Sequence, residues 1–353
     1  ERMCGNSNTS LIDWQPTSGG DRLVAGGMLA NDRGGAVDIR MRVHRWMNDF
    51  ETAGGKIVYG AVSPKQLDEI SAANDLTALA VGKGDLARII PRDPERSVYD
   101  KPQRNLCMLI CEGVKHVAAS RMNWTPVKFN FFADAGEYFW VPYTHKDKGR
   151  TWCVLFEPKP GSYLDKFGDC TSPSDVAEVA RSLIREHAPY EWEHVKELRP
   201  VEDDPHCWLK GRFPPTVRMG SGRTESGGLV IPIGDVAILF DPIGGQGGNC
   251  AAKNTNFIAD RIIKHGKQPF DEEWAEKLRN DFWDFYGRAA YTFNNILLEP
   301  LTECGKMVLG TAAQNFEFAT EHFFGNIDKP NNYFPWMEEL EAAKQKIAPY
   351  SGN

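Results

Sequence analysis

Four glycines surround a single glutamine in the stretch DPIGGQGGN, which occupies residues 241–249. These glycines are Gly244, Gly245, Gly247 and Gly248, with Pro242 before them and Gln246 between them. Glycine lets the backbone come close to a ligand and adopt positive φ values, which residues with a Cβ resist. A plain linker between two elements needs fewer glycines, so the pattern predicts a loop that touches a ligand.

A helical pattern follows the loop, and Asn249 is a residue type that caps such a helix. Its predicted inner face carries Phe257, Ile258, Ile262 and Ile263, and Gly266 is expected to end it. Free N–H groups and the positive end of the helix dipole would then point out of the loop and stabilise an electron-rich, flat or anionic group. Asp235, at the end of the preceding predicted strand, adds a carboxylate that can accept hydrogen bonds from sugar-type hydroxyls.

The composition is that of an ordinary globular protein of 353 residues, with 41% hydrophobic and 25% charged residues. This length fits about two or three domains. The formal net charge of -7 gives nucleic acid or an anionic membrane no general electrostatic attraction. No apolar run approaches the roughly 20 residues that cross a bilayer, so we expect a cytoplasmic protein.

The eight cysteines are scattered and form no Cys-x-x-Cys pair. Several lie in apolar runs, where cysteine behaves as a small hydrophobic residue, so we expect reduced core thiols and no metal site. Cys107 and Cys111 would share one face of a strand and belong to the core. His44 and His145 could face a substrate, but we interpret each as a surface or packed histidine. No nucleophile or acid–base pair stands out, and catalytic residues are left unassigned.

The elements that must position the loop begin with helices and strands in alternation. They are a helix over 42–53, a strand over 56–62, a helix from Ser63 and a buried strand over 75–82. Gly54 and Gly55 would stop the first helix, and Ser63 with Gln66 forms a capping box for the second. Residues 38–84 therefore have the pattern of a parallel α/β layer.

The pattern then changes to strands with few helices between them. The segments NLCMLIC, KFNFF, EYFWVPY and TWCVLFEP predict an antiparallel sheet between residues 105 and 158. Its aromatic side chains are expected to pack on one face and to line an apolar substrate cavity on the other, with packing alone as the alternative. A helix over 173–187, a buried strand over 227–235 and a helical region from Asp271 follow. The opening residues, ERMCGNSNTSLIDW, have a loop-like composition.

Two blocks of the sequence resemble a known family. The stretch from Gly234 to Asn249, with GD five residues before DPIGGQGGN, resembles the second flavin motif of FAD-dependent aromatic hydroxylases. Residues 53–107, with GK after the strand and the run SVYDKPQR, resemble the oxygenase component of styrene and indole monooxygenases. The resemblance covers most of residues 36–265, and the C-terminal helices match only in general character.

The resemblance implies an α/β fold, of the α+β two-domain kind. It combines a Rossmann-like FAD-binding domain, incomplete at its N-terminus, with an antiparallel β-sheet substrate domain and C-terminal helices. The expected parts are a partial FAD-binding domain (1–104), the substrate-binding domain (105–226), the second part of the FAD-binding domain (227–270) and a C-terminal helical region (271–353).

Members of this family begin with a strand and a G-x-G-x-x-G turn that seats the FAD pyrophosphate, and the sequence shows no such segment at its start. GKGDLA, at 82–87, fits the glycine spacing after a strand. It fails as a dinucleotide fingerprint because Pro91 follows within two turns and no second strand carries an acidic ribose ligand. We therefore expect the N-terminal segment of the FAD-binding domain to be missing from this sequence.

The resemblance also assigns cofactor contacts. It places Asp235 at the ribityl and pyrophosphate region, the loop from Pro242 to Asn249 along the isoalloxazine, and Gly82 beside the FAD adenosine. Arg40 stands where the family keeps an arginine close to the flavin, with a solvated surface charge as the alternative. The expected cofactor-binding residues are Arg40, Gly82, Asp235, Pro242, Gly244, Gly245, Gln246, Gly247, Gly248 and Asn249.

The activity implied is that of a flavin-dependent monooxygenase. FAD reduced by a separate NAD(P)H-dependent flavin reductase would react with O2 to give a C4a-hydroperoxyflavin, which epoxidises or hydroxylates an apolar aromatic or alkene substrate such as styrene or indole. The cofactor carries this chemistry, so no catalytic dyad is required of the protein. A homodimer is left open. The alternatives are a single-component NAD(P)H-dependent aromatic hydroxylase, a flavin-dependent halogenase of the same fold, or a non-catalytic flavin-binding remnant.

Overall fold

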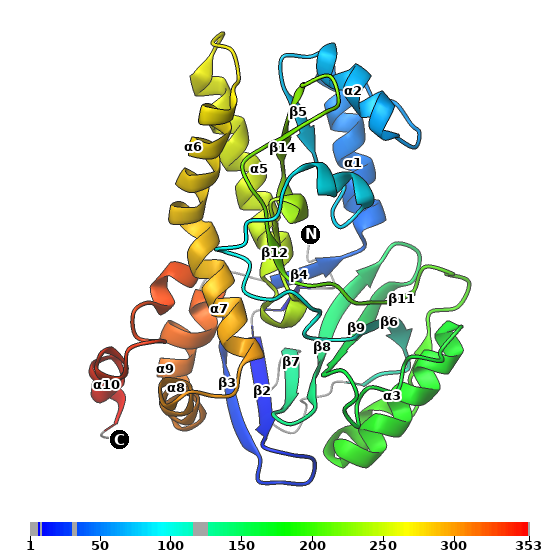
Figure 1. The fold of residues 1–353 in the computed structure, drawn as a ribbon. Helices are drawn as coiled ribbons and strands as arrows, with labels where there is room; N and C mark the ends of the chain where they lie inside the picture. The colour runs from blue at the N-terminus through cyan, green and yellow to red at the C-terminus, as the bar shows by residue number, and fades with distance from the viewer. Residues whose placement is uncertain (1–5, 8, 30–33, 116–125, 352–353) are drawn as a thin grey trace. The chain divides into compact units, whose positions relative to one another are not determined.

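The computed structural model describes residues 6–7, 9–29, 34–115 and 126–351 (Figure 1). The chain divides into two compact units, each assembled from segments far apart in the sequence. The first comprises residues 1–58, 104–212 and 301–353, and the second comprises 59–103 and 213–300. The four-part division by function that the family resemblance implies stays a prediction.

A large sheet dominates the first unit. Its strands are β1 (Asn6–Ser7), β2 (Thr9–Gln15), β3 (Leu23–Met28), β4 (Gly34–Val37), β6 (Leu106–Glu112), β7 (Val127–Phe132), β8 (Gly136–His145), β9 (Gly149–Pro158), β10 (Arg199–Pro200) and β11 (Trp208–Gly211). The main path runs β10, β6, β9, β8, β7, β2, β3, while β11 pairs with β6 and β4 pairs with β8 and β1. The neighbours β6, β9, β8 and β7 are antiparallel, which confirms the predicted antiparallel layer.

The loop-like reading of the N-terminal residues was wrong, because β2 lies inside this sheet. It pairs with β3 in antiparallel and with β7 in parallel register. The polar residues that suggested a loop are buried and have partners across the fold. Asp13 forms an ion pair with Lys128 of β7, and Gln15 donates a hydrogen bond to the hydroxyl of Tyr190. Long-range partners of this kind cannot be read from local composition.

Helix α3 (Pro173–His187) covers one face of the sheet and is the predicted helix over 173–187. Ser172 and Asp175 form a capping box at its start. Val176, Ala180 and Ile184 on its inner side join one buried cluster with side chains of β6, β8 and β9, and Figure 1 shows α3 alongside these strands. Burial of this apolar stripe against the sheet stabilises both elements.

The other helices of the first unit are α1 (Ile39–Thr52), α4 (Trp192–Val195), α8 (Glu303–Gln314), α9 (Phe316–Phe318) and α10 (Leu340–Ile347). Helix α1 confirms the prediction for 42–53. None of its side chains is buried by the described residues, and Trp46 and Phe50 are 58% and 53% exposed. Helix α8 packs against β3, at the edge of the sheet path.

The second unit holds α2 (Pro64–Ala72), β5 (Thr77–Leu79), β12 (Thr216–Val217), β13 (Gly222–Arg223), β14 (Leu229–Pro232), β15 (Ile238–Leu239), α5 (Gln246–His265), α6 (Glu272–Phe282) and α7 (Arg288–Leu298). Strands β5 and β14 confirm the buried strands predicted over 75–82 and 227–235, and they pair in parallel. The capping box of Ser63 and Gln66 begins α2 as predicted. This unit therefore holds the second half of the α/β layer predicted over 38–84, whereas α1 belongs to the first unit.

One predicted strand is absent from the described residues. Residues 56–62 form no strand, and Val58 and Tyr59 are 78% and 79% exposed. A run rich in β-branched and aromatic residues has a high strand propensity, but a strand forms only where a neighbour accepts its backbone hydrogen bonds. Among the described residues this run has no such neighbour.

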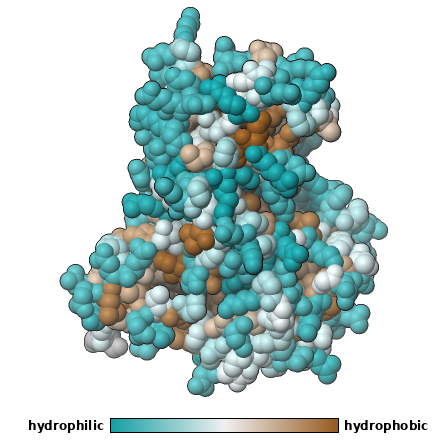
Figure 2. All heavy atoms as spheres, in the orientation of Figure 1, coloured by the Kyte–Doolittle hydropathy of each residue, from teal (hydrophilic) through white to brown (hydrophobic). Residues whose placement is uncertain are grey.

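The described cysteines are free thiols, and all of them are buried except Cys153, which is partly buried. Cys107 and Cys111 lie in the core cluster beneath α3, as predicted. Cys4 lies outside the described residues. The face drawn in Figure 2 is mainly hydrophilic, with apolar side chains gathered in a few patches.

Candidate functional site

A pocket of about 580 Å³ lies in the second unit, where the parallel strands β5 and β14 end. Ala80 and Gly82 follow β5 in its wall, and Ile233 to Asp235 follow β14. Ligands of open α/β sheets bind outside the carboxyl ends of the strands, and pockets of about 300–1,000 Å³ are usual for small molecules. The pocket therefore has the position and size expected of a cofactor site.

Many of the residues predicted to bind the cofactor line this pocket. They are Gly82, Asp235, Pro242, Gly245, Gly247 and Gly248. Gly244, Gln246 and Asn249 belong to the same loop and helix start without lining the pocket, and Arg40 belongs to the other unit.

The loop turns into α5 earlier than the sequence suggested. Asn249 was predicted to cap the helix, but Gly245 occupies the N-cap with a left-handed φ of 62° and the helix begins at Gln246. Asn249 lies in the first turn and its side-chain amide donates to the carbonyl of Gly245 over 3.2 Å. A left-handed glycine can make this turn without a side-chain cap, which is the physical reason for the error.

The glycines of the first turn of α5 face open space. At Gly247 and Gly248 no protein atom lies within 4 Å of the place that a Cβ would occupy. Glycine in a helix costs about 0.5–1 kcal/mol relative to alanine. The packing of the described residues does not require glycine at these positions, which leaves the backbone of this turn bare on the pocket side.

The neighbouring residues give the loop its shape. A Cβ on Gly244 would lie 2.5 Å from Oδ1 of Asn294, and that oxygen accepts a hydrogen bond from the backbone N–H of Gly244. Gln246 is fully buried; its amide donates to the carbonyl of Gly244, and its oxygen accepts from the hydroxyl of Tyr286. Gly244 and Gln246 therefore fix the conformation of the loop through contacts on its buried side.

Asp235 lies in a single 3-10 turn that follows β14. The turn is fixed to α5, because the backbone N–H of Gly234 donates to Oδ1 of the buried Asn254 over 2.9 Å. The Asp235 carboxylate borders the pocket, and no described residue donates a hydrogen bond to it. Partial burial raises its pKa, and the charge of Lys83 acts in the opposite direction. This acceptor is free for hydroxyl groups of a ligand.

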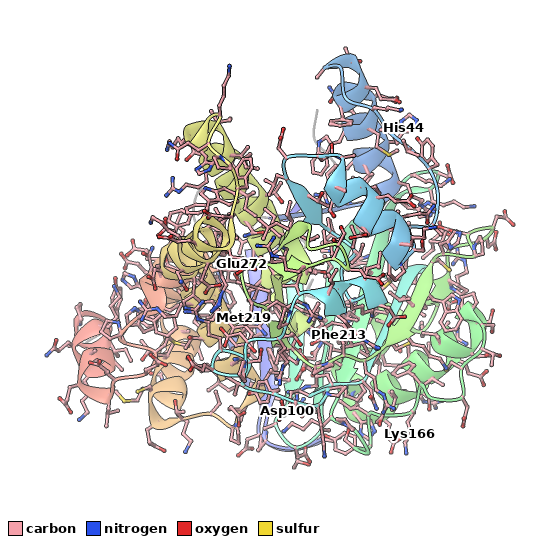
Figure 3. The ribbon with its side chains drawn as sticks, turned by 45° about the horizontal axis from the view of Figure 1, so that its top comes forward. His44, Asp100, Lys166, Phe213, Met219 and Glu272 are labelled. Carbon is pink, nitrogen blue, oxygen red and sulfur yellow. The ribbon has the colours of Figure 1, made fainter. Side chains whose placement is uncertain are left out.

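Several pocket residues carried no signal in the sequence. Phe213, which is labelled in Figure 3, lines the pocket, and the side chain of Lys83 covers its ring with Nζ 4.7 Å from the ring centroid. Phe213 lies in an irregular segment, so no periodicity marked it. Ala251 and Thr255 also line the pocket. Their spacing from Gly248 on α5 is helical, and that pattern would have identified them.

Arg40 in the first unit is engaged by two carboxylates. Its guanidinium donates to both oxygens of Asp38 and to both oxygens of Asp204. Hydrogen bonds from Arg40 lower the pKa of Asp38 to about 2 and lower that of Asp204 as well. The guanidinium thus fastens the start of α1 to the loop that holds Asp204, and its role towards a cofactor stays a prediction.

His145 is a packed histidine and not a free base. Its Nδ1 accepts hydrogen bonds from the backbone N–H groups of Asp147 and Lys148, so the proton is on Nε2, which donates to Asp204 over 2.8 Å. The ring is buried, with 1% of the residue exposed. His44 is exposed on α1 (Figure 3). Both observations agree with the interpretation from the sequence.

The described residues contain no group of three or more His, Cys, Asp or Glu side chains arranged to hold a metal ion. Within the same residues, no helix is both long and apolar enough to span a membrane.

The sequence matches one protein family and two curated relatives. A family model described as "Styrene monooxygenase A putative substrate binding domain" matches residues 82–194. Styrene monooxygenase StyA of Pseudomonas fluorescens is 29% identical over 327 residues, which cover 90% of this chain and 75% of that protein. A second StyA, from Pseudomonas sp, is 27% identical over 249 residues, which cover 69% of this chain and 58% of that protein.

Solved structures show the same fold. The flavin-dependent brominase Bmp2 has a TM-score of 0.60 at 10% identity, over 98% of this chain and 80% of its own. The halogenase PltM has a TM-score of 0.56 at 11% identity, over 99% of this chain and 80% of its own. Such low identities establish the fold alone, and they confirm the predicted α/β flavoprotein fold.

The sequence relatives and the position of the pocket point to the same class of protein. The relatives are styrene monooxygenases, and the pocket lies at the carboxyl ends of parallel strands, where open α/β sheets usually bind ligands. By these comparisons the chain is similar to the oxygenase component of styrene monooxygenases, and it has the fold of the flavin-dependent halogenases.

Proposed function

We propose that the chain binds FAD in the pocket of the second unit and uses it, once reduced, to epoxidise or hydroxylate an apolar aromatic or alkene substrate such as styrene or indole. The observation that supports this most strongly is the first turn of α5. Gly247 and Gly248 line the pocket, and the space beside them is open for a flat ring. The proposal also draws on the likeness to StyA of Pseudomonas fluorescens.

Each residue of the pocket has a part in this proposal. The N–H groups at the start of α5, together with the positive end of its dipole, stabilise negative charge on the bound ring. Asp235 accepts hydrogen bonds from the hydroxyl groups of the ribityl chain. Pro242 and Gln246 fix the shape of the loop. FAD supplies the redox and O2 chemistry when bound, so the chain needs to orient it and exclude water.

The substrate is proposed to contact the face of the large sheet that lies opposite α3. Successive residues of a strand point to opposite faces. On β7, Phe132 belongs to the core cluster beneath α3, so Phe129 and Phe131 point to the other face. These two rings stack with centroids 6.0 Å apart, and Phe129 also contacts Phe139 of β8, at 5.1 Å. Partly exposed aromatic rings of this kind suit an apolar aromatic substrate.

The partners proposed are O2, a small apolar aromatic substrate and a separate NAD(P)H-dependent flavin reductase. The reductase rests on the family resemblance, because no described feature of the chain identifies a nicotinamide site. A homodimer and a cytoplasmic location stay predictions.

The experiment supplies purified chain with FAD, NADH, an unrelated flavin reductase and styrene or indole, and measures the oxygenated product. We expect product only when chain, reductase and substrate are all present. Product without reductase would favour a single-component hydroxylase. A halogenated product in the presence of chloride or bromide would favour the halogenase alternative. Absence of product together with tight FAD binding would favour a non-catalytic flavin-binding protein.

A further inference from the structure

Lys83 stands at the rim of the pocket with its ammonium group over one aromatic residue of the wall. It follows Gly82, which lines the pocket and has a left-handed φ of 59°. Its Nζ lies 4.7 Å from the ring centroid of Phe213, which lines the pocket as well. The side chain is exposed, yet it folds back over this ring and does not extend into solvent.

The charge of Lys83 is not neutralised by the described residues. No described carboxylate lies within the ion-pair distance of its Nζ, and the ring of Phe213 holds the ammonium group without cancelling its charge. The same charge acts on Asp235 across the pocket rim. The described lining of the pocket contains no lysine or arginine, and Lys83 lies beside two of its residues, as the chain neighbour of Gly82 and over the ring of Phe213. Lys83 therefore offers a cation beside the pocket, without a carboxylate partner among the described residues, for an anionic part of a ligand.

We propose that Lys83 is a positioning residue that holds the phosphate of the bound flavin, so that the pocket selects phosphorylated flavins over riboflavin. Lysine presents a compact point charge on a flexible stem, a side chain well suited to phosphate. Phe213 keeps the ammonium group at the rim, and Asp235 marks the adjacent place for the ribityl hydroxyls. This inference rests on the proposed function, because it assumes that the pocket takes a flavin.

The test titrates the full chain with riboflavin, FMN and FAD and follows the quenching of flavin fluorescence. Lys83→Met removes the charge, and Lys83→Arg keeps it. Lys65→Met is a matched control, because Lys65 lies in the same unit with its side chain 87% exposed. We expect the wild-type chain to bind FMN and FAD at least about tenfold more tightly than riboflavin at low salt. Lys83→Met should lose most of this preference with an unchanged riboflavin Kd, while the other two variants keep it.

The outcomes separate this inference from the function on which it rests. If wild type binds all three flavins equally and Lys83→Met changes nothing, the inference is wrong and the flavin pocket stands. If Lys83→Met weakens riboflavin as much as FMN, Lys83 supports the pocket structurally and does not hold phosphate. If wild type binds no flavin, the proposed function and the inference are both wrong. The urea unfolding midpoint of each variant shows whether the fold is retained.

Discussion

Replacement of Gly248 by alanine tests whether a flavin lies against the first turn of α5. No protein atom lies within 4 Å of the added Cβ, so the methyl group meets no steric conflict within the chain. Alanine is favoured over glycine in a helix by about 0.5–1 kcal/mol. The variant without ligand should therefore be more stable, with a Tm about 1–3 °C higher.

The same methyl group should weaken the binding of the cofactor. A flavin in van der Waals contact with the bare backbone must move away to make room for it, and overpacking of this kind costs about 1–3 kcal/mol. This cost corresponds to a Kd for FAD that is about 5- to 150-fold weaker. Stability and affinity are thus expected to change in opposite directions, which a general loss of folding cannot produce.

Gly310→Ala is the matched control. Gly310 lies in α8, in the first unit, and its added Cβ also meets no atom within 4 Å. This variant should gain similar stability and bind FAD like the wild-type chain. Thermal unfolding without ligand and fluorescence titration with FAD measure both quantities. If Gly248→Ala binds FAD within about twofold of wild type while both variants are stabilised, the flavin does not lie on this turn and the reasoning is refuted.

Three further predictions concern the rest of the chain. Asp38→Asn should lower the free energy of unfolding by about 1–2 kcal/mol near pH 6, because the Arg40 hydrogen bonds lower the Asp38 pKa to about 2. This difference in urea unfolding free energy should shrink as the pH falls from about 5 towards 3, and a constant difference would contradict the assignment. Lys128→Met should lower the free energy of urea unfolding by about 3–5 kcal/mol, because it leaves the buried Glu191 carboxylate without its cation. A decrease below about 1 kcal/mol would show that the fold does not need this ion pair. Burial raises the pKa of Cys250 to about 12, so iodoacetamide at neutral pH should label it in urea but not in the native chain, as peptide mass spectrometry will show.

The ion pair at Lys128 also shows how buried polar groups of the first unit are stabilised by partners inside the fold. Its Nζ contacts Glu191 and lies 2.9 Å from Oδ2 of Asp13, in a close charge pair whose direction is not that of a hydrogen bond. The hydroxyl of Tyr138 and the indole N–H of Trp140 donate to the other oxygen of Glu191. These donors offset the cost of removing the Glu191 carboxylate from water. Removal of one partner leaves that cost uncompensated and lowers the stability of the fold.

Local signals made parts of the fold predictable. Each of the capping boxes at Ser63 and Ser172 marks the start of a helix within a few neighbouring residues, and both helix starts are observed. The glycine loop identified much of the pocket wall, because the need for bare backbone is a local property of Gly247 and Gly248. These features depend on neighbours in the chain, so the sequence carries them directly.

Features that depend on distant partners were missed. Strand β2 was mistaken for a loop because Asp13 and Gln15 have distant partners in the sequence, Lys128 and Tyr190. Ile263, predicted on the inner face of α5, is 79% exposed, whereas Asn254 is buried because it anchors Gly234. Phe213 reaches the pocket from an irregular segment that has no periodicity. In each case the deciding contact joins residues far apart in the sequence.

Equilibrium binding of reduced FAD, measured anaerobically with dithionite-reduced cofactor, tests the central claim most directly. The account predicts saturable binding of one FAD per chain, and it predicts that Gly248→Ala weakens this binding while Gly310→Ala does not. Reduced FAD that remains free at every protein concentration, with a correctly folded chain, would contradict the account.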